Sequence, residues 1–122
     1  MKENCIEIKG NSIKGNLDIL FYENDGAIIA YAPSLDLMGY GINEEEAKSS
    51  FEVVLSNFFH KCLQEGTLDK CLKQCGWKKD GTKEFTSLNL ADSASKNRTV
   101  RKILSLPRFT KTAHPIRISA GR

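Results

Sequence analysis

Long hydrophobic runs are missing from this sequence. Its apolar stretches are only a few residues long, whereas a membrane-spanning helix needs about 20 consecutive apolar residues. The first residues, Met-Lys-Glu-Asn-Cys, also lack the apolar centre of a secretion signal. We therefore expect a cytoplasmic protein with no membrane partner. The length of 122 residues suits one domain with a hydrophobic core and a shorter additional segment.

Motifs for catalysis and cofactor binding are missing as well. There is no P-loop and no nucleophile elbow, and Gly39-Tyr40-Gly41 lacks the third glycine of a dinucleotide-binding loop. His60 and His114 have no recognisable partner motif. Asp18 and Asp36 are the one acidic pair worth inspecting, but Asp18 lies on the polar face of its strand and is expected to face solvent. The sequence gives no positive case for an enzyme or for a cofactor.

The cysteines do not form the spacing of a metal knuckle. Cys71 and Cys75 lie four residues apart, and Cys5 and Cys62 stand alone, so no CxxC pair exists. His60 could complete a zinc set only in principle. We expect no metal, and we expect thiols rather than disulfides, because the cytoplasm keeps cysteines reduced.

Arginine is absent from the first 77 residues, which hold seven lysines and twelve acidic residues and so carry a net charge of −5. Residues 78–122 hold six lysines and five arginines against three acidic residues, a net charge of +8. Such asymmetry predicts that the basic segment meets a polyanion or an acidic protein face. A solvated tail without a fixed partner explains the charges almost as well.

The candidate nucleic-acid-binding residues all lie in this basic segment, where they offer charges that neutralise phosphates. They are Lys96, Arg98, Arg101, Lys102, Arg108, Lys111 and Arg117.

Alternating apolar residues predict strands in the first part of the chain. Ile6 and Ile8 alternate with polar neighbours, and the same period follows over residues 17–21. Asn24-Asp25-Gly26 supplies the positive φ angles of a tight hairpin turn, so residues 27–31 form the antiparallel partner. Residues 37–41 predict a further short strand whose glycines mark a bend or a close approach of backbones.

From Asn43 the apolar period changes to three and four residues, which predicts a helix that ends at Gly66. Asn43 can cap its first turn, with Glu46 in the capping-box position. The apolar side consists of Ala47, Phe51, Val54, Leu55, Phe58, Cys62 and Leu63. Because Phe58 and Phe59 point about 100° apart, we expect Phe59 to face a second subunit or a partner.

A short second helix is predicted after Thr67, which would cap it, and Trp77 is expected to close the core. Residues 78–83 read as an exposed turn, residues 99–106 as a short helix and residues 114–118 as an extended strand. The predicted fold is α+β. A small antiparallel sheet of three to four strands packs on one long helix in a domain of residues 1–77, followed by a basic C-terminal extension of residues 78–122.

The segment Ala30-Tyr31-Ala32-Pro33-Ser34-Leu35-Asp36-Leu37-Met38-Gly39-Tyr40-Gly41, followed by Asn43-Glu44-Glu45-Glu46-Ala47, resembles HicB-like antitoxins of bacterial toxin–antitoxin modules. In that family a hairpin strand ends in a proline-containing loop, a glycine-bearing strand follows, and a polar cap with paired glutamates and an alanine begins the helix. Glu65-Gly66-Thr67-Leu68 and Gly76-Trp77 extend the resemblance over about residues 17–77. Asn43 stands where threonine is common, and residues 78–122 show neither the helix-turn-helix nor the ribbon-helix-helix of many members.

The resemblance implies a degenerate ribonuclease-H-like sheet that inhibits a HicA-like, RNA-cleaving toxin, in a dimer or larger oligomer. The basic segment would then wrap the toxin, complete the oligomer or contact promoter DNA. Two alternatives stay open. One is a stand-alone nucleic-acid-binding regulator that uses the basic segment, and the other is a vestigial nuclease that depends on Asp18.

Overall fold

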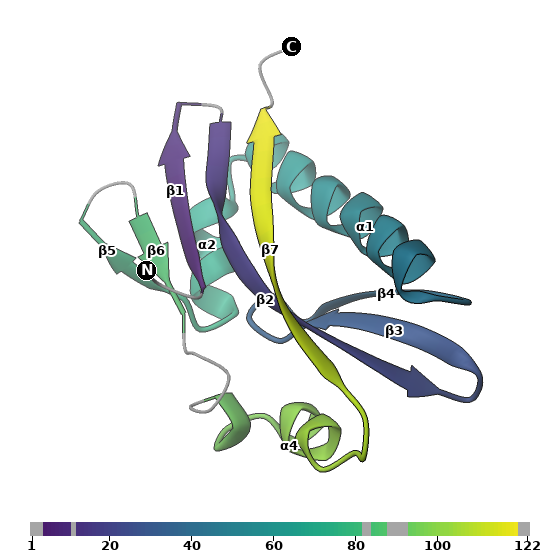
Figure 1. The fold of residues 1–122 in the computed structure, drawn as a ribbon. Coiled ribbons are helices and arrows are strands. Elements are labelled where there is room, and N and C mark those ends of the chain that lie inside the picture. Colours follow the sequence, from purple (N-terminus) through teal and green to yellow (C-terminus); the bar gives the residue numbers. More distant parts are fainter. Residues whose placement is uncertain (1–3, 11, 82–83, 88–92, 120–122) are drawn as a thin grey trace.

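The computed structural model describes residues 4–10, 12–81, 84–87 and 93–119 (Figure 1). The strands are β1 (Cys5–Lys9), β2 (Ser12–Asn24), β3 (Ala27–Ala32), β4 (Leu37–Gly41), β5 (Lys78–Asp80), β6 (Glu84–Thr86) and β7 (Thr110–Ser119), and the helices are α1 (Glu44–Glu65), α2 (Leu68–Gln74) and α4 (Arg98–Leu104). The predicted α+β class and antiparallel sheet are confirmed, but the described residues form seven strands instead of three or four. None of the described helices is both long enough and apolar enough to cross a membrane.

The long strand β2 is paired along both of its edges. Leu20 and Phe21 pair with β3 and with β7 at the same time, so β3 and β7 lie on opposite edges of β2. β1 and β7 also lie on opposite edges of β2, because Ser12 and Asn16 pair with both of these strands. One edge of β2 therefore carries β1 and β3 in succession, and β7 occupies the other. The full order is β4-β3-β2-β1-β6-β5, with β7 beside β2.

Strands of the basic segment, residues 78–122, are part of this sheet, which therefore has more strands than the three or four predicted. β6 and β5 continue the sheet beyond β1, and β5 lies where an exposed turn was expected. β7 begins at Thr110, four residues before the predicted strand, and pairs with β2 from Ser12 to Phe21. This segment pairs with β2 because its buried and exposed residues alternate, as in a strand with one face on the core. His114 and Ile116 are buried, whereas Ala113, Pro115 and Arg117 are exposed.

The predicted hairpin turn between β2 and β3 is confirmed, since Asp25 and Gly26 have φ angles of 53° and 82°. The glycine prediction for β4 is confirmed too. A Cβ atom at Gly39 would collide with the backbone of Phe51, so glycine is what lets β4 lie directly against α1.

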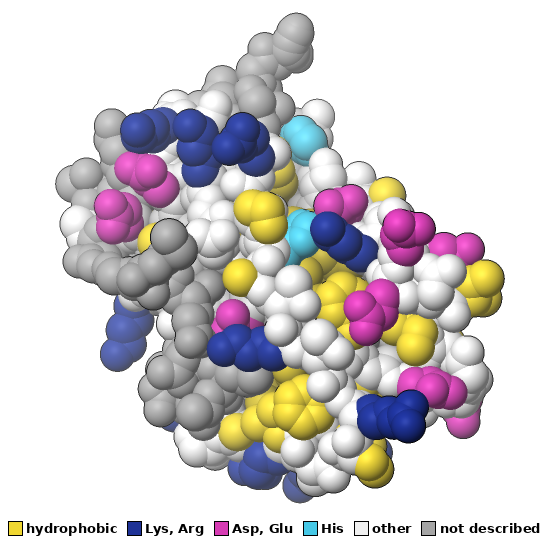
Figure 2. All heavy atoms as spheres, in the orientation of Figure 1, with side chains coloured by type: hydrophobic (Ala, Val, Ile, Leu, Met, Phe, Trp, Pro, Cys, Tyr) yellow, Lys and Arg dark blue, Asp and Glu magenta, His cyan; other side chains and the backbone are white. Residues whose placement is uncertain are grey.

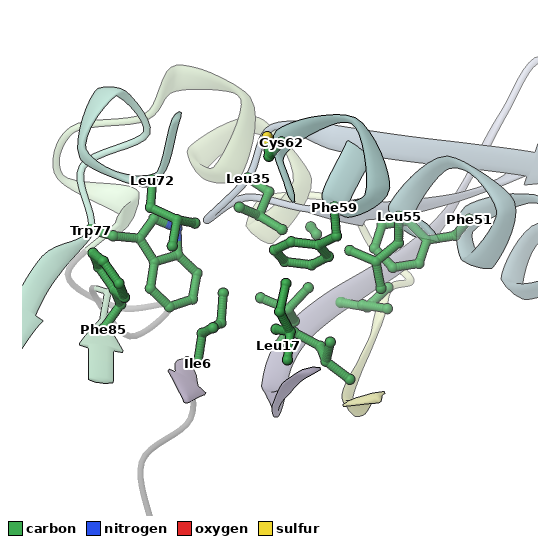
Figure 3. Packing of buried hydrophobic residues seen from close by; sticks show 14 of the residues in the cluster. Ile6, Leu17, Leu35, Phe51, Leu55, Phe59, Cys62, Leu72, Trp77 and Phe85 are labelled. Atoms are coloured by element: carbon green, nitrogen blue, oxygen red, sulfur yellow. The ribbon is translucent and has the colours of Figure 1, made fainter. Parts of the chain in front are cut away.

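Helix α1 begins and ends where the sequence predicted. The Asn43 side chain accepts a hydrogen bond from the Glu46 N–H at 2.8 Å, and Gly66 ends the helix with a φ of 68°. The prediction for Phe59 is wrong, because this residue is 0% exposed and points from α1 toward Leu17 of β2 (Figure 3). Phe58 lies at the margin of the core instead, and the two rings meet edge to face at 5.2 Å. Phe59 is therefore not available at the surface to form the interface of the expected oligomer.

Helix α2 and Trp77 close the other end of this core, as predicted. Trp77 is buried beside Leu72 and Phe85 (Figure 3), and its indole N–H donates to the Ser34 carbonyl at 2.7 Å. Thr67 precedes α2 but makes no side-chain capping bond to it.

Helix α4 packs on the sheet face opposite α1. Val100 and Ile103 of α4 form a second buried cluster with Leu20 and Tyr31, whose neighbours Ile19 and Ala30 face α1. The helix spans residues 98–104 instead of 99–106, because the Asn97 side chain caps it through the Val100 N–H at 3.1 Å. The sheet is therefore covered on both faces around the middle of β2 (Figure 1).

Asp18 lies on β2 between the residues that pair with β1 and those that pair with β3. The Asn4 side chain accepts the Asp18 backbone N–H at 2.9 Å and donates to the Asp18 carboxylate at 3.3 Å. Asp18 is 3% exposed, so the prediction that it faces solvent is wrong. A buried backbone N–H needs an acceptor, and Asn4 supplies it on the edge of β2 where neither β1 nor β3 pairs with Asp18.

The sheet pairing predicts that the protein does not fold stably without β7. Removing residues 108–122 exposes the β2 edge and deletes Ile116, whose burial alone contributes about 1.5–3 kcal/mol out of a typical total stability of about 5–15 kcal/mol. We expect the 1–107 fragment to aggregate or to lose its cooperative thermal transition, measured by circular dichroism and sedimentation. Arg117→Ser, an exposed change within β7, should keep the transition. A monomeric fragment that melts like the full chain would contradict the account.

Buried His114 predicts a fall in stability at mildly acidic pH. Burial lowers the pKa of His114 below its ordinary value of 6.5; Glu52, whose carboxylate lies 3.7 Å from Nε2, opposes this shift, and Lys48 adds to it. The folded state thus binds this proton less readily than the unfolded state. The His114 contribution is complete above about pH 6.5 and is lost as the pH falls toward the lowered pKa.

We therefore expect the free energy of unfolding to depend less on pH between about 6.5 and 5 in His114→Gln than in the wild type. Urea titrations at several pH values measure this slope. Asn57→Gln, at an exposed position of α1, should keep the wild-type slope, and equal slopes in all three proteins would contradict the prediction.

Candidate protein-binding surface

The two most exposed large hydrophobic side chains lie on β4 and between β4 and α1. Tyr40 is 66% exposed and Ile42 is 78% exposed, and Met38 beside them is exposed as well. Large apolar residues that stay in water at neighbouring positions are typical of a binding surface. Val53 on α1 and Phe109 before β7 are exposed separately.

The strand geometry explains why these residues point outward. Gly39 and Gly41 face α1, so the alternation of β4 directs Met38 and Tyr40 to the opposite face of the sheet. Tyr40 pairs with Ile29, and Ile29 pairs with Tyr22, which forms an apolar row across three strands. The inner members of this row lie against the cluster under α4, whereas Tyr40 at the sheet edge remains exposed.

Acidic side chains border the exposed apolar residues. Glu44, Glu45 and Glu46 form the first turn of α1 after Ile42 and the cap residue Asn43, and all three are exposed. Figure 2 shows hydrophobic and acidic side chains intermixed on the right of the view, over β3, β4 and α1. We define the β4–α1 surface as Met38, Tyr40, Ile42, Glu44 and Glu45.

Beside the β4–α1 surface the molecule is hollowed. A cavity of about 530 Å³ lies between the end of β2, the start of α1 and the segment before β7. Glu23, Glu44, Tyr22 and Phe109 are among its lining residues, together with Arg108. A partner side chain could enter here next to the exposed aromatic residues.

The outer edge of β4 is protected against the addition of another strand. The Tyr40 N–H donates to the Ser50 hydroxyl at 3.3 Å, and the Ile42 N–H donates to the Glu46 carboxylate at 3.1 Å. Side chains of α1 thus occupy two of the donors that a foreign strand would need. A partner would therefore contact the side chains of this surface rather than extend the sheet.

The predicted nucleic-acid-binding residues are all exposed, but they do not form one patch. Arg98, Arg101 and Lys102 lie at spacings of three and four on the outward side of α4, opposite its buried residues. Arg101 also donates to the Ala94 and Ser95 carbonyls at 3.3 and 3.4 Å. Lys96 precedes this helix, and Arg108 and Lys111 follow it.

Arg117 belongs to a second basic group that the sequence did not predict. It stands directly opposite Lys14 on β2, and Lys9 on β1 lies diagonally beyond, next to Glu7. Figure 2 shows these two regions as dark blue side chains at the top of the view and again at the bottom. Lys9 and Lys14 are visible as basic residues in the sequence, but only the strand register shows that they lie near Arg117.

The remaining reactive groups include the cysteine thiols and two aspartates that lie apart. Burial, together with neighbouring Cys71, raises the pKa of the Cys62 thiol to about 12, which disfavours a reactive thiolate. Asp36 is exposed and accepts a hydrogen bond from the Tyr31 hydroxyl at 2.9 Å, whereas Asp18 is buried against Asn4. Among the described residues no group of three or more His, Cys, Asp or Glu side chains could hold a metal ion.

The chain matches no protein-family model, no curated protein and no solved structure in the comparisons. The interpretation of its surfaces therefore depends on their own geometry and charge.

Proposed function

We propose that this protein is an inhibitory binding protein of the antitoxin type, and that its β4–α1 surface covers a small, basic, RNA-cleaving toxin of the HicA-like class. The observation that carries the proposal is the combination of the exposed residues Met38, Tyr40 and Ile42 with the acidic first turn of α1. A toxin that binds RNA presents positive charge, and an acidic surface with apolar anchors is complementary to it.

The two kinds of residue have different roles in this proposal. Exposed aromatic and aliphatic side chains that become buried on binding supply most of the affinity, so Tyr40 is the expected hot spot. Glu44 and Glu45 would attract a basic partner and speed the encounter, which makes the association rate depend on salt.

The resemblance to HicB-like antitoxins supports the same surface. The residues that carry it, from Ala30 to Ala47, include β4, the glycines that bring β4 against α1, and the Asn43 cap. They build the scaffold that exposes Tyr40 and Ile42. A degenerate ribonuclease-H-like origin of the sheet, assembly into a homo-oligomer and a cytoplasmic location are part of this proposal.

A second candidate function is nucleic-acid binding, and the outward side of α4 favours it. Arg98, Arg101 and Lys102 offer three cations on one short helix, and Arg108 and Lys111 lie on the segment that follows. In an antitoxin this surface would contact promoter DNA, while the β4–α1 surface holds the toxin.

Co-expression with a basic protein encoded by a neighbouring gene tests the first function. We expect a stable complex and relief of growth inhibition, and Tyr40→Ser combined with Ile42→Ser should weaken binding by about 2 kcal/mol or more, about 30-fold in Kd. Calorimetry on the purified proteins measures this change.

Val53→Ser is the matched control, because Val53 is 61% exposed but lies outside the β4–α1 surface. It should change the binding free energy by less than about 0.5 kcal/mol. Equal binding by the wild type and the double variant would place the toxin elsewhere, and the absence of any toxic partner would remove the proposal.

A titration against duplex DNA from the upstream region at several salt concentrations tests the second function. Replacing Arg98, Arg101 and Lys102 by Gln should reduce the slope of log K against log salt by about 2.7, because each of the three lost phosphate contacts contributes about 0.9. Lys61, Lys70 and Lys73 are exposed on α1 and α2 and serve as the matched triple replacement. Equal slopes for both triple variants would contradict a role of α4.

A further inference from the structure

Part of the sheet has no described helix over its outer face. Helix α4 covers the face opposite α1 around Leu20 and Tyr31, near the middle of β2. Farther along, β7, β2, β1 and β6 lie side by side, and α4 does not extend over them there (Figure 1). We define the open sheet face as the outward side chains of residues 5–7, 14–16, 84–86 and 115–117.

Four charged residues form one row across the open sheet face, one from each strand. Arg117 of β7 pairs with Lys14 of β2, and Lys14 pairs with Glu7 of β1. Glu7 in turn pairs with Glu84 of β6. Chain neighbours of all four are buried in the core under α1, so the alternation of the strands directs these charges to the outer face. Glu7 is partly exposed, and the other three residues are exposed.

The order of the charges along this row is unfavourable within a single copy. The two cations are direct neighbours, and the two carboxylates are direct neighbours, so only Lys14 and Glu7 form a pair of opposite sign. Directly paired side chains have Cβ atoms about 4.5–5.5 Å apart, and like charges at such positions destabilise a sheet. Figure 2 shows dark blue side chains at the top of the view with magenta side chains to their lower left. This segregation favours a partner that brings the opposite charges.

The row is complementary to a second copy of itself. A rotation of 180° about an axis that runs between β1 and β2, parallel to the strands, places Arg117 over Glu84 of the second copy. The same rotation places Lys14 over Glu7 of the second copy. In a two-fold interface each contact occurs twice. Every charge of the row then faces a charge of opposite sign.

The neighbouring row on the same face consists of short, uncharged side chains. Pro115 pairs with Asn16, Asn16 pairs with Cys5, and Cys5 pairs with Thr86. The rotation places Pro115 over Thr86 of the second copy, and Asn16 over Cys5. Because two stacked sheets lie about 10 Å apart, short side chains fit between them while the longer charged side chains reach across.

We propose that the open sheet face is the surface through which two copies of this chain associate. Four strands are only about 20 Å wide, so the contact is smaller than the roughly 800 Å² per partner of a standard interface. The association is therefore weak, and it depends on protein concentration and on salt. It supplies an interface for the homo-oligomer of the proposed function, but it needs no toxin and is tested on this chain alone.

Sedimentation velocity of the full chain tests the association. We expect a dimer fraction that grows between about 10 µM and about 1 mM protein, the range in which a small interface is populated. The dissociation constant should rise by about tenfold or more between about 50 mM and about 500 mM sodium chloride, because salt screens the row. A reducing agent excludes disulfides between copies. A wild type that stays monomeric throughout would overturn the proposal.

A pair of charge swaps tests the geometry. Arg117→Glu places a carboxylate beside Lys14, and Glu84→Lys places a cation beside Glu7. Each change replaces a like-charge pair by an opposite-charge pair, so both variants should fold at least as stably as the wild type. In a dimer of either variant the contacts between positions 117 and 84 become repulsive, and self-association should weaken by about tenfold or more.

Mixing the two variants restores every opposite-charge contact, so the mixture should associate at least as tightly as the wild type. General attraction cannot explain such a recovery. The net charge of +3 falls by two in one variant and rises by two in the other, so both proteins stay positive.

Lys70→Glu and Glu65→Lys form the matched control pair, because both residues are exposed on α2 and α1, outside the open sheet face. Each should leave the dissociation constant within about twofold of the wild-type value. A mixture of the charge swaps that associates no better than either variant alone would overturn the two-fold arrangement. Self-association that both swaps leave unchanged would overturn the open sheet face as the interface.

Discussion

The pairing of β2 along both edges is the constraint on which the rest of the structure depends. β1 and β3 share one edge, and β7 occupies the other over ten residue pairs. This arrangement joins the two ends of the described chain in one sheet and places buried side chains on both of its faces, under α1 and under α4. It also creates the point along β2 where neither β1 nor β3 is present and where Asn4 supplies the acceptor for the Asp18 N–H.

The opposite charges of the two chain segments therefore end up on one folded unit. Acidic residues surround the apolar side chains at β4 and the start of α1, while basic residues lie on α4 and at the far end of β7. The edge strands are unsuited to pairing with further strands. Side chains of α1 occupy backbone donors of β4, and β5 has only three residues. β7 contains Pro115, Lys111 and Arg117. Partners are thus expected on side-chain surfaces, which is where the apolar anchors and the charges are.

Local signals in the sequence predicted the elements that depend on local physics. The Asp25-Gly26 turn, the Asn43 cap and the Gly66 stop are all present, because each needs only a particular residue type at one position. What the sequence could not predict depends on register and long-range pairing. Whether Phe58 or Phe59 faces the sheet depends on the rotation of α1, and the burial of Asp18 depends on Asn4, 14 residues away. The basic residues were found individually, but their division between α4 and β7 follows from β7 lying beside β2.

Hydrogen exchange of the backbone amides tests most directly whether the basic segment is built into the sheet. Because the Asp18 N–H points to Asn4, the paired residue Ala113 lies at a non-hydrogen-bonded position, and the amides of Thr112 and His114 donate to β2. We expect these two amides to exchange as slowly as those of Leu20 and Tyr31, which pair β2 with β3, in a single cooperative unit. Fast exchange of Thr112 and His114 while Leu20 and Tyr31 stay protected would show that β7 is a separate tail, which contradicts its place in the sheet.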